Sequence, residues 1–209
     1  MKSYGYSLLE VMVASTILGV VSLLGFVVLK SSNEAAQLST AKVDVQNHLR
    51  DSMAVMTGEL REAVSSETTN RTGAPEGLYA VSVDETGGSI TFQVPEAVAG
   101  EEQFAYSSSI TYSLENEDAN GNGRLDEGED SNDDGVLTRR IVRTQDGVEV
   151  PLASANSIDT VTFLLVANQA AGNNQLTTVN IQMTGSKRYG PAEGKLVVSE
   201  LESSIRLVN

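Results

Sequence analysis

An acidic segment at residues 115–134 has the residue types and the spacing of a calcium-binding loop. Its sequence, ENEDANGNGRLDEGEDSNDD, holds nine acidic residues and one Arg. Calcium takes about 6–8 oxygen ligands, and a twelve-residue calcium loop supplies them at alternating positions around a glycine that permits a sharp turn. With Asp118 as its first position, the segment matches this loop. The predicted ligands are Asp118, Asn120, Asn122, Arg124 through its backbone carbonyl, Asp126 through water, and Glu129 with both oxygens, and Gly123 stands at the turn.

A second loop of the same kind begins directly after the first. It starts with Asp130, Asn132 and Asp134, followed by Gly135, but Ile141 stands where the closing Glu is needed. This second loop is either a weaker metal site or one that shares ligands with the first. The alternative for the whole segment is a solvated acidic loop, since its Asp, Asn and Gly content favours such a match by itself.

The flanks of this segment, TYSLEN and LTRRIVR, read as strands rather than as the helices of an EF-hand. The sequence therefore predicts a calcium loop inserted in a β domain. Such a loop lacks the helix pair whose opening makes a sensor, so a bound ion would have a structural role.

Glu10 is a second residue whose position calls for a chemical explanation. It directly precedes residues 11–29, which carry no charge and are as long as a helix that crosses a bilayer. A carboxylate at the start of a membrane helix is costly, and its presence indicates a function. If a peptidase cut after Gly5, the new amine on Tyr6 would lie one helical turn from Glu10. The corresponding amine of a neighbouring subunit could then pair with Glu10 and set the axial register of adjacent helices.

The run Gly5-Tyr6-Ser7-Leu8-Leu9-Glu10, followed by the apolar segment, resembles the class III signal of type IV prepilins and type II secretion pseudopilins. The resemblance implies that a prepilin peptidase cleaves after Gly5 and methylates the new amine of Tyr6. It also implies that Glu10 guides assembly and that the N-terminal helix packs against other pilin or pseudopilin subunits. Two features depart from the family. The first mature residue is usually Phe, whereas here it is Tyr6. Many pilins have a Pro within the buried helix, whereas this sequence has none before residue 75.

Shorter similarities extend further along the chain. Leu60-Arg61-Glu62-Ala63 and the ending Ile205-Arg206-Leu207-Val208-Asn209 resemble W-type minor pilins and J-type minor pseudopilins. The resemblance implies a minor subunit in, or at the tip of, an envelope filament. The sequence leaves open whether the machine is a pilus, a secretion system or a DNA-uptake filament. The alternative function is a membrane-anchored calcium-binding module for surface recognition or adhesion.

Hydrophobic periodicity predicts the elements that position these residues. Residues 1–5 read as a leader peptide, 6–30 as a transmembrane and filament-core helix, and 31–66 as the amphipathic continuation of that helix. This second half carries an apolar stripe that must be buried against another part of the protein. The stripe comprises Leu38, Val45, Leu49, Met53, Met56, Leu60 and Val64.

Residues 67–209 read as a periplasmic β-rich domain that carries the acidic loop at 115–135. Short alternating runs predict strands at 78–83, 89–94, 110–114, 136–143, 161–166, 177–183 and 196–199. The segment 200–208 reads equally as strand or helix. We therefore expect an α+β fold, in which an antiparallel sheet packs on the stripe of the long helix.

Composition limits the remaining function classes. A formal net charge of −14 argues against nucleic acid as a direct partner, because phosphate binding needs clustered Lys and Arg. The chain has no Cys, and its one His, His48, lies in the helix, so we expect no enzymatic activity and no catalytic residues. The hairpin KRYGPAEG favours an exposed turn over a contact of Arg188 and Tyr189 with a partner. We expect insertion in the bacterial inner membrane before assembly, with the N-terminus cytoplasmic and the C-terminal domain periplasmic.

Overall fold

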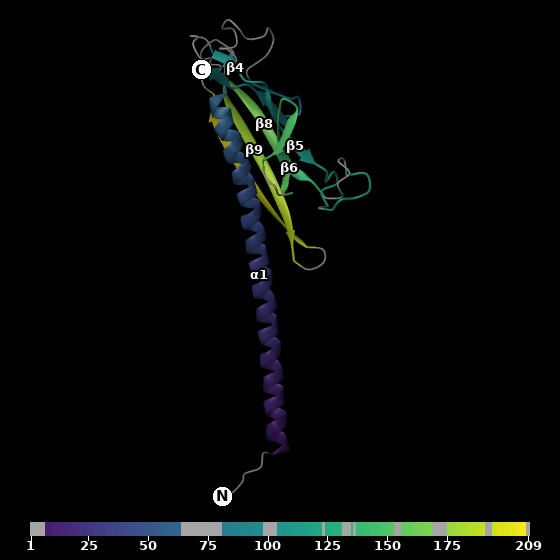
Figure 1. Cartoon of the computed structure of the whole chain (residues 1–209). Coiled ribbons are helices and arrows are strands. Elements are labelled where there is room, and N and C mark those ends of the chain that lie inside the picture. The colour runs from purple at the N-terminus through teal and green to yellow at the C-terminus, as the bar shows by residue number, and fades with distance from the viewer. Residues whose placement is uncertain are drawn as a thin grey trace.

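A computed structural model describes residues 7–63, 81–97, 104–122, 124–130, 135, 137–152, 156–168, 175–190 and 194–207. One long helix is followed by ten short to medium strands in this part of the chain (Figure 1). The elements are α1 (Leu8–Glu62), β1 (Val81–Val83), β2 (Ser89–Phe92), β3 (Pro95–Ala97), β4 (Phe104–Tyr106), β5 (Ile110–Asn116), β6 (Arg139–Gln145), β7 (Val148–Pro151), β8 (Ile158–Asn168), β9 (Gln175–Tyr189) and β10 (Lys195–Arg206).

Helix α1 runs without interruption for 55 residues, which corresponds to a length of about 80 Å. At its start the Ser7 hydroxyl accepts a hydrogen bond of 3.2 Å from the backbone N–H of Glu10, a Ser-x-x-Glu capping arrangement. At its end Ala63 turns to an extended conformation. The strands lie along the C-terminal half of α1 only, so the N-terminal half projects alone from the molecule (Figure 1).

The strands form three antiparallel sheets. The first has the order β1-β2-β5-β6-β7, the second β10-β9-β8, and the third is the pair β3-β4. The second sheet lies directly on α1 through β9 and β10, and its edge strand β8 meets the first sheet. The predicted fold class, a long N-terminal helix packed against antiparallel β-structure, is confirmed.

The core lies between α1 and the two larger sheets. Its helical members are Val45, Leu49, Met53, Met56 and Leu60, all of which the sequence stripe predicts. Leu38 was predicted in this stripe, but its side chain is 40% exposed, and the first buried residue of the helix is Ala41. The last predicted member, Val64, lies outside the described residues. The sheets contribute Ile90, Phe92, Tyr112, Ile141, Phe163, Val179, Ile181 and Met183.

The structure differs from the predicted strands mainly in their extent. β9 and β10 pair over twelve residues, from Lys195 opposite Tyr189 to Arg206 opposite Thr178. This long pairing makes 200–206 a strand, which resolves the choice that local pattern left open. The sequence missed three strands, β3, β4 and β7. Each has only three or four residues, too few for an alternating pattern to stand out.

A polar cluster ties the end of α1 to the first sheet. The Tyr112 hydroxyl donates to Glu59 Oε2 over 2.6 Å, and Arg143 Nε donates to both oxygens of the same carboxylate at 3.0 and 3.1 Å. Burial, together with the adjacent Glu59 carboxylate, raises the pKa of the Tyr112 phenol above its usual value. The tyrosine therefore stays a neutral donor, and the cluster fixes the rotation of the helix relative to β5 and β6.

Candidate functional site

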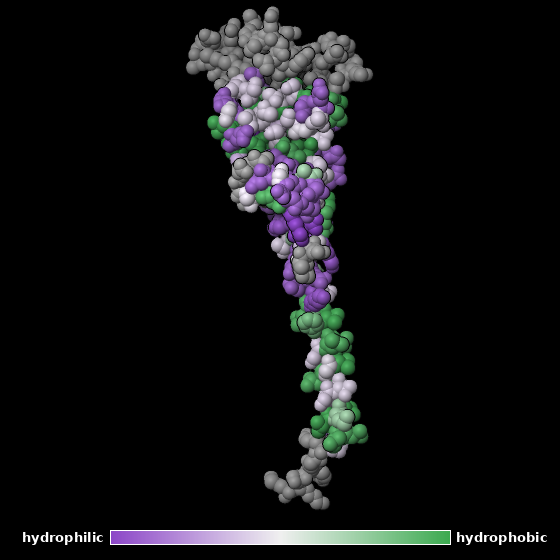
Figure 2. Space-filling view, turned by 90° about the vertical axis from the view of Figure 1, so that its right-hand side faces the viewer, coloured by the Kyte–Doolittle hydropathy of each residue, from purple (hydrophilic) through white to green (hydrophobic). Residues whose placement is uncertain are grey.

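The N-terminal half of α1 presents a continuous apolar surface that no other described residue covers. Between Leu8 and Leu29 its large hydrophobic side chains are 52–79% exposed. Figure 2 shows hydrophobic side chains along this part of the stalk and hydrophilic ones on the β domain directly above it. Among the described residues this is the one helix long and apolar enough to span a bilayer. Such a surface needs lipid or other helices around it.

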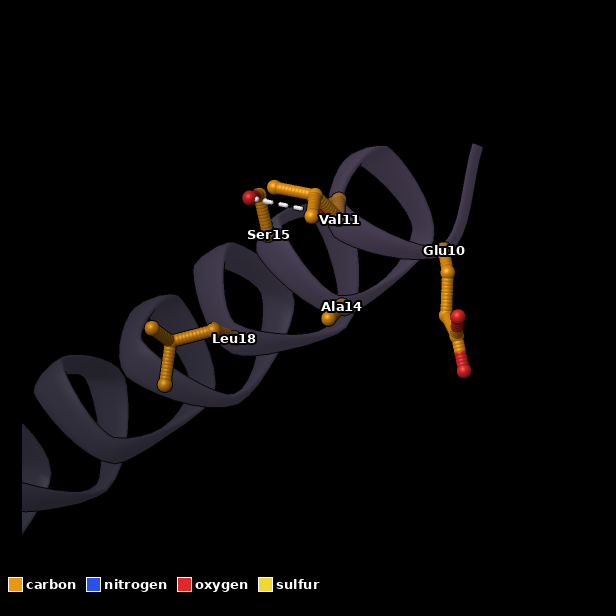
Figure 3. A pocket seen from close by; sticks show the side chains of 5 residues that line it. All are labelled: Glu10, Val11, Ala14, Ser15 and Leu18. Carbon is orange, nitrogen blue, oxygen red and sulfur yellow. Dashed lines mark hydrogen bonds between the residues drawn. The ribbon is translucent and has the colours of Figure 1, made fainter. Parts of the chain in front are cut away.

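Glu10 lies in the first turn of this apolar helix, where a negative charge interacts favourably with the helix dipole. Its carboxylate extends away from the helix axis, as Figure 3 shows. No Lys, Arg or His within the described ranges forms an ion pair with it. The carboxylate is thus directed outwards, where a group from another molecule can reach it.

Two small side chains, Ala14 and Ser15, lie near Glu10 on the helix surface. A shallow groove is lined by Glu10, Val11, Ala14, Ser15 and Leu18 (Figure 3). The Ser15 hydroxyl donates to the Val11 carbonyl over 2.7 Å, so its polar group is satisfied within the helix. Small residues allow helix backbones to approach closely in a membrane. The groove is therefore suited to contact with a second helix.

The acidic loop connects β5 to β6, as its predicted strand flanks require. β5 ends at Asn116 and β6 begins at Arg139. The pairing of Asn116 with Arg139 closes the loop at its base. The loop is thus a long insertion in a hairpin at one side of the β domain.

Four of the predicted ligands lie close together in this loop. The side-chain amides of Asn120 and Asn122 donate to Asp126 Oδ2 at 2.8 and 2.5 Å. Glu129 accepts the backbone N–H of Asn120 with one oxygen and that of Asp126 with the other, at 3.3 and 3.0 Å. The hydrogen bonds from Asn120 and Asn122 lower the pKa of the Asp126 carboxyl below its usual value, so it is ionised at neutral pH.

The remaining predicted side-chain ligand, Asp118, has a different environment. Its side chain is only 1% exposed and forms an ion pair of 3.5 Å with Arg139 Nη1. The same Arg139 nitrogen contacts Asp159 Oδ1 at 2.5 Å and Ser186 Oγ at 3.2 Å. Arg139 thus holds the first loop residue against β8 and β9, which belong to the other sheet.

The described ligands do not form a ready-made metal cluster. No group of three His, Cys, Asp or Glu side chains within the described ranges is close enough to hold a metal ion. The amide oxygens of Asn120 and Asn122 accept the backbone N–H groups of Asn122 and Arg124. Both amides would have to turn before their oxygens could face an ion beside Asp126.

Several predicted site residues lie outside the described residues. These are Gly5, Tyr6, Gly123, Asn132 and Asp134. From the second loop the structure describes Asp130, whose Oδ2 accepts the backbone N–H of Gly135 at 2.9 Å.

Sequence reasoning missed the structural roles of two residues. Ser7 caps α1, and the Ser7-Leu8-Leu9-Glu10 pattern could have indicated this. Arg139 anchors the acidic loop, but its partners Asp118, Asp159 and Ser186 are 20 to 47 positions away. No local signal in the sequence reports such a contact.

Comparison with known proteins identifies the N-terminal segment. The prokaryotic N-terminal methylation motif matches residues 1–26. The chain therefore carries a class III prepilin signal, the signal of a pilin- or pseudopilin-type precursor. The motif together with the apolar half of α1 fits a membrane-anchored pilin, and it implies processing by a prepilin peptidase and assembly with other pilins. Neither the curated proteins nor the solved structures that were compared gave a match to this chain.

Proposed function

We propose that this chain is a minor pilin or minor pseudopilin, a structural subunit of an envelope filament. A prepilin peptidase cleaves it after Gly5 and methylates the amine of Tyr6. The processed subunit is stored in the inner membrane, with its β domain in the periplasm, and then joins the filament or its tip. Its action is mechanical rather than enzymatic, through helix packing, subunit register and presentation of the β domain.

One observation carries this proposal: the methylation motif at residues 1–26 leads directly into a helix with two different environments. The first half is apolar and uncovered, whereas the second half is buried against the β domain from Ala41 to Leu60. A permanent anchor needs only the apolar length. The outward-directed Glu10, beside a groove that contains the small residues Ala14 and Ser15, adds a feature suited to lateral packing of helices.

The minor-subunit assignment rests on the two short similarities in the sequence. Leu60-Arg61-Glu62-Ala63 lies at the end of α1. Ile205 and Arg206 end β10, where they pair with Val179 and Thr178 of β9. Both similarities therefore fall where the helix and the last strand close the same end of the domain. The partner subunits of this chain would distinguish a pilus, a secretion system and a DNA-uptake filament.

We also propose a structural calcium site in the acidic loop, held by Asp118, Asn120, Asn122, Arg124, Asp126 and Glu129. The proximity of Asn120, Asn122 and Glu129 to Asp126 supports it, because a turn of the two amides would bring their oxygens beside one ionised carboxylate, and calcium takes oxygen ligands. Calcium would replace these internal hydrogen bonds and relieve the repulsion of the crowded acids. A second ion at Asp130, Asn132 and Asp134 would extend the same site.

The mass of the N-terminal peptide from the native membrane or filament fraction tests the proposed function. We expect a peptide that begins at Tyr6 and carries one extra methyl group. A peptide that retains residues 1–5 in a strain with an active prepilin peptidase would contradict processing. The chain would then be a permanent anchor for a calcium-binding recognition or adhesion module, the function that the acidic loop alone would favour.

A further inference from the structure

A pocket of about 380 Å³ lies between the start of the acidic loop and the second sheet. Figure 1 shows this loop projecting from β5 and β6, on the side of the β domain that also carries the β9–β10 hairpin. The loop and the strands β8, β9 and β10 all contribute to the pocket. Its lining includes Asp118, Asp159, Ser186, Leu196 and Val198. The pocket thus joins acidic, polar and aliphatic side chains that are far apart in the sequence.

The acidic side of the pocket has one more carboxylate than its internal partner neutralises. Arg139 Nη1 lies 2.5 Å from Asp159 Oδ1 and 3.5 Å from Asp118 Oδ2. With their formal charges, these three side chains sum to one net negative charge. Arg139 does not line the pocket, and neither does Arg188, which is opposite Leu196 in the strand pairing. The lining that the structure describes therefore presents negative charge without a basic residue.

Asp159 offers an acceptor that the fold leaves open. Its side chain is 29% exposed, and Oδ1 is the oxygen that contacts Arg139. No donor in the described ranges forms a hydrogen bond with the other oxygen, Oδ2. The Ser186 hydroxyl, which accepts from Arg139 Nη1 at 3.2 Å, also lines the pocket. A cationic donor that enters the pocket can therefore pair with Asp159 without displacing Arg139.

Leu196 and Val198 give the same pocket an aliphatic side. They are successive residues on one face of β10, and their side chains are 51% and 60% exposed. A lysine or arginine side chain combines an aliphatic stem with a charged head, so it covers apolar surface while its head pairs with an anion. The pocket presents an aliphatic surface and an open carboxylate oxygen together, as such a side chain requires.

The size and exposure of the pocket favour a side chain over a free small molecule. Its volume is near the lower end of ligand sites, which span about 300–1,000 Å³ and bury about 70–90% of a bound ligand. The two aliphatic side chains are more than half exposed, which indicates an open depression rather than an enclosed cavity. The acidic loop, whose start lines the pocket, holds nine acids and one Arg and attracts a basic protein surface at longer range.

We propose that this pocket is a docking site for a lysine or arginine side chain of a partner protein. The charged head pairs with Asp159 Oδ2, and the stem lies on Leu196 and Val198. The site gives the β domain a recognition surface beyond the mechanical role in the proposed function. It depends neither on cleavage after Gly5 nor on calcium in the acidic loop.

A titration with a single capped side chain tests the pocket in the full chain in detergent micelles. The probe is Nα-acetyl-lysine methylamide, added in the presence of chelator to a chain with isotope-labelled Leu and Val methyl groups. We expect the methyl resonances of Leu196 and Val198 to shift saturably, with a dissociation constant on the order of millimolar for a ligand of this size. Val148 and Val150 are the internal reference, because they are 62% and 47% exposed on β7 and do not line the pocket.

An uncharged probe separates recognition of the cation from contact with the aliphatic stem. Nα-acetyl-norleucine methylamide has the same four-carbon stem as the lysine probe but lacks the amino group. It should give shifts at Leu196 and Val198 that are at least about fivefold smaller, because it cannot form the charge-assisted hydrogen bond with Asp159.

Matched variants separate recognition at Asp159 from total charge. Asp159→Asn should weaken binding of the lysine probe about tenfold, because it removes the negative charge but keeps an oxygen for Arg139. Glu115→Gln removes the same charge from a carboxylate that is 28% exposed, is also paired with an arginine and does not line the pocket, so it should bind as the wild type does. Val198→Thr keeps the branched shape and should weaken binding about threefold through lost apolar contact. Circular dichroism checks the fold of each variant.

Three results would overturn the proposal. Equal shifts with the lysine and norleucine probes would identify an apolar surface that does not recognise a cation. Equal shifts at Val148 and Val150 would show nonspecific binding, and the absence of a saturable shift at roughly tens of millimolar probe would exclude the site. None of these results bears on processing at Gly5, which the mass of the N-terminal peptide tests separately.

Discussion

At the scale of single residues, Gly185 decides how closely β9 approaches α1. A Cβ atom at this position would lie 2.5 Å from the Ser157 carbonyl oxygen and about as close as packing allows to Val45 and Leu49, at 3.2 and 3.3 Å. The Ser157 carbonyl cannot move aside easily, because it accepts the backbone N–H of Ser186 at 2.9 Å. The absence of a side chain at Gly185 is therefore a condition for the helix–sheet contact.

We expect Gly185→Ala to lower the free energy of unfolding by about 1–3 kcal/mol, as overpacking in a core does. Thermal unfolding of the full chain in detergent measures the change. Gly58→Ala is the matched control, since it lies on an exposed face of α1 with no atom within 4 Å of the added Cβ. This control should stabilise the protein by about 1 kcal/mol, because Ala is the better helix former. Equal effects of the two variants would contradict the role of Gly185.

At the scale of the element, the β5–β6 loop combines repulsion between its acidic side chains with hydrogen bonds and an ion pair that hold some of them in place. Its acids repel one another, and the hydrogen bonds on Asp126 and Glu129 offset only part of this repulsion. Asp118 is held by Arg139 in the buried base of the loop, so its removal would leave a buried guanidinium with one carboxylate fewer. Asp118→Ala should therefore destabilise the protein even without calcium, and Glu129 is the better residue for testing the ion.

We expect millimolar calcium to raise the melting temperature of the wild-type chain and to leave that of Glu129→Gln unchanged. A dissociation constant of about 0.3 mM, within the range of extracellular calcium modules, gives about 2 kcal/mol at roughly 10 mM calcium. This corresponds to a shift of about 4–8 °C for a domain of this size. The measurement is thermal unfolding in calcium and in chelator.

Glu127→Gln is the control for this prediction, because it removes the same charge at an exposed loop position that is not a predicted ligand. Its melting temperature should rise in calcium as that of the wild type does. If calcium stabilises none of the three proteins, the segment is a solvated acidic loop. Equal stabilisation of all three would indicate general charge screening rather than a site.

At the scale of the whole molecule, the two halves of α1 differ in how their apolar side chains are covered. The β domain buries the apolar stripe in the second half of α1, whereas residues 8–29 are uncovered on every side by the described residues. Under the proposed function, a bilayer covers this surface in storage, and the helices of other subunits cover it in a filament. Glu10 would then matter only in the filament, where the amine of a neighbouring subunit could reach it.

We expect Glu10→Leu to leave membrane insertion intact and to reduce incorporation into the filament fraction by at least about tenfold. Removal of one member of a buried ion pair typically costs about 3–5 kcal/mol, because the other charge stays buried without its partner. Co-isolation of the variant with its partner subunits measures incorporation. Glu62→Leu removes an exposed acid from the last turn of the same helix and should assemble normally. Normal assembly of Glu10→Leu would favour a permanent anchor.

The sequence alone determined the features that depend on local pattern. Each of these patterns is visible within a short stretch of sequence. They are the apolar run at 11–29, the alternation in the strands, and the stripe with a 3.6-residue period formed by Val45, Leu49, Met53, Met56 and Leu60. These patterns predicted a long helix packed on antiparallel sheet. The prepilin signal was equally predictable, because its motif consists of residues that are neighbours in the sequence.

Only the tertiary structure decided which distant residues meet. The pairing of β10 with β9 turned an ambiguous segment into a strand that ends at Arg206, and the packing of the sheets on α1 left Leu38 exposed. The contacts of Arg139 with Asp118 and of Lys195 with Glu34 join residues 21 and 161 positions apart. Such contacts depend on strand register and on the position of the helix against the sheets. These are set by packing of the whole core, which no short stretch of sequence encodes.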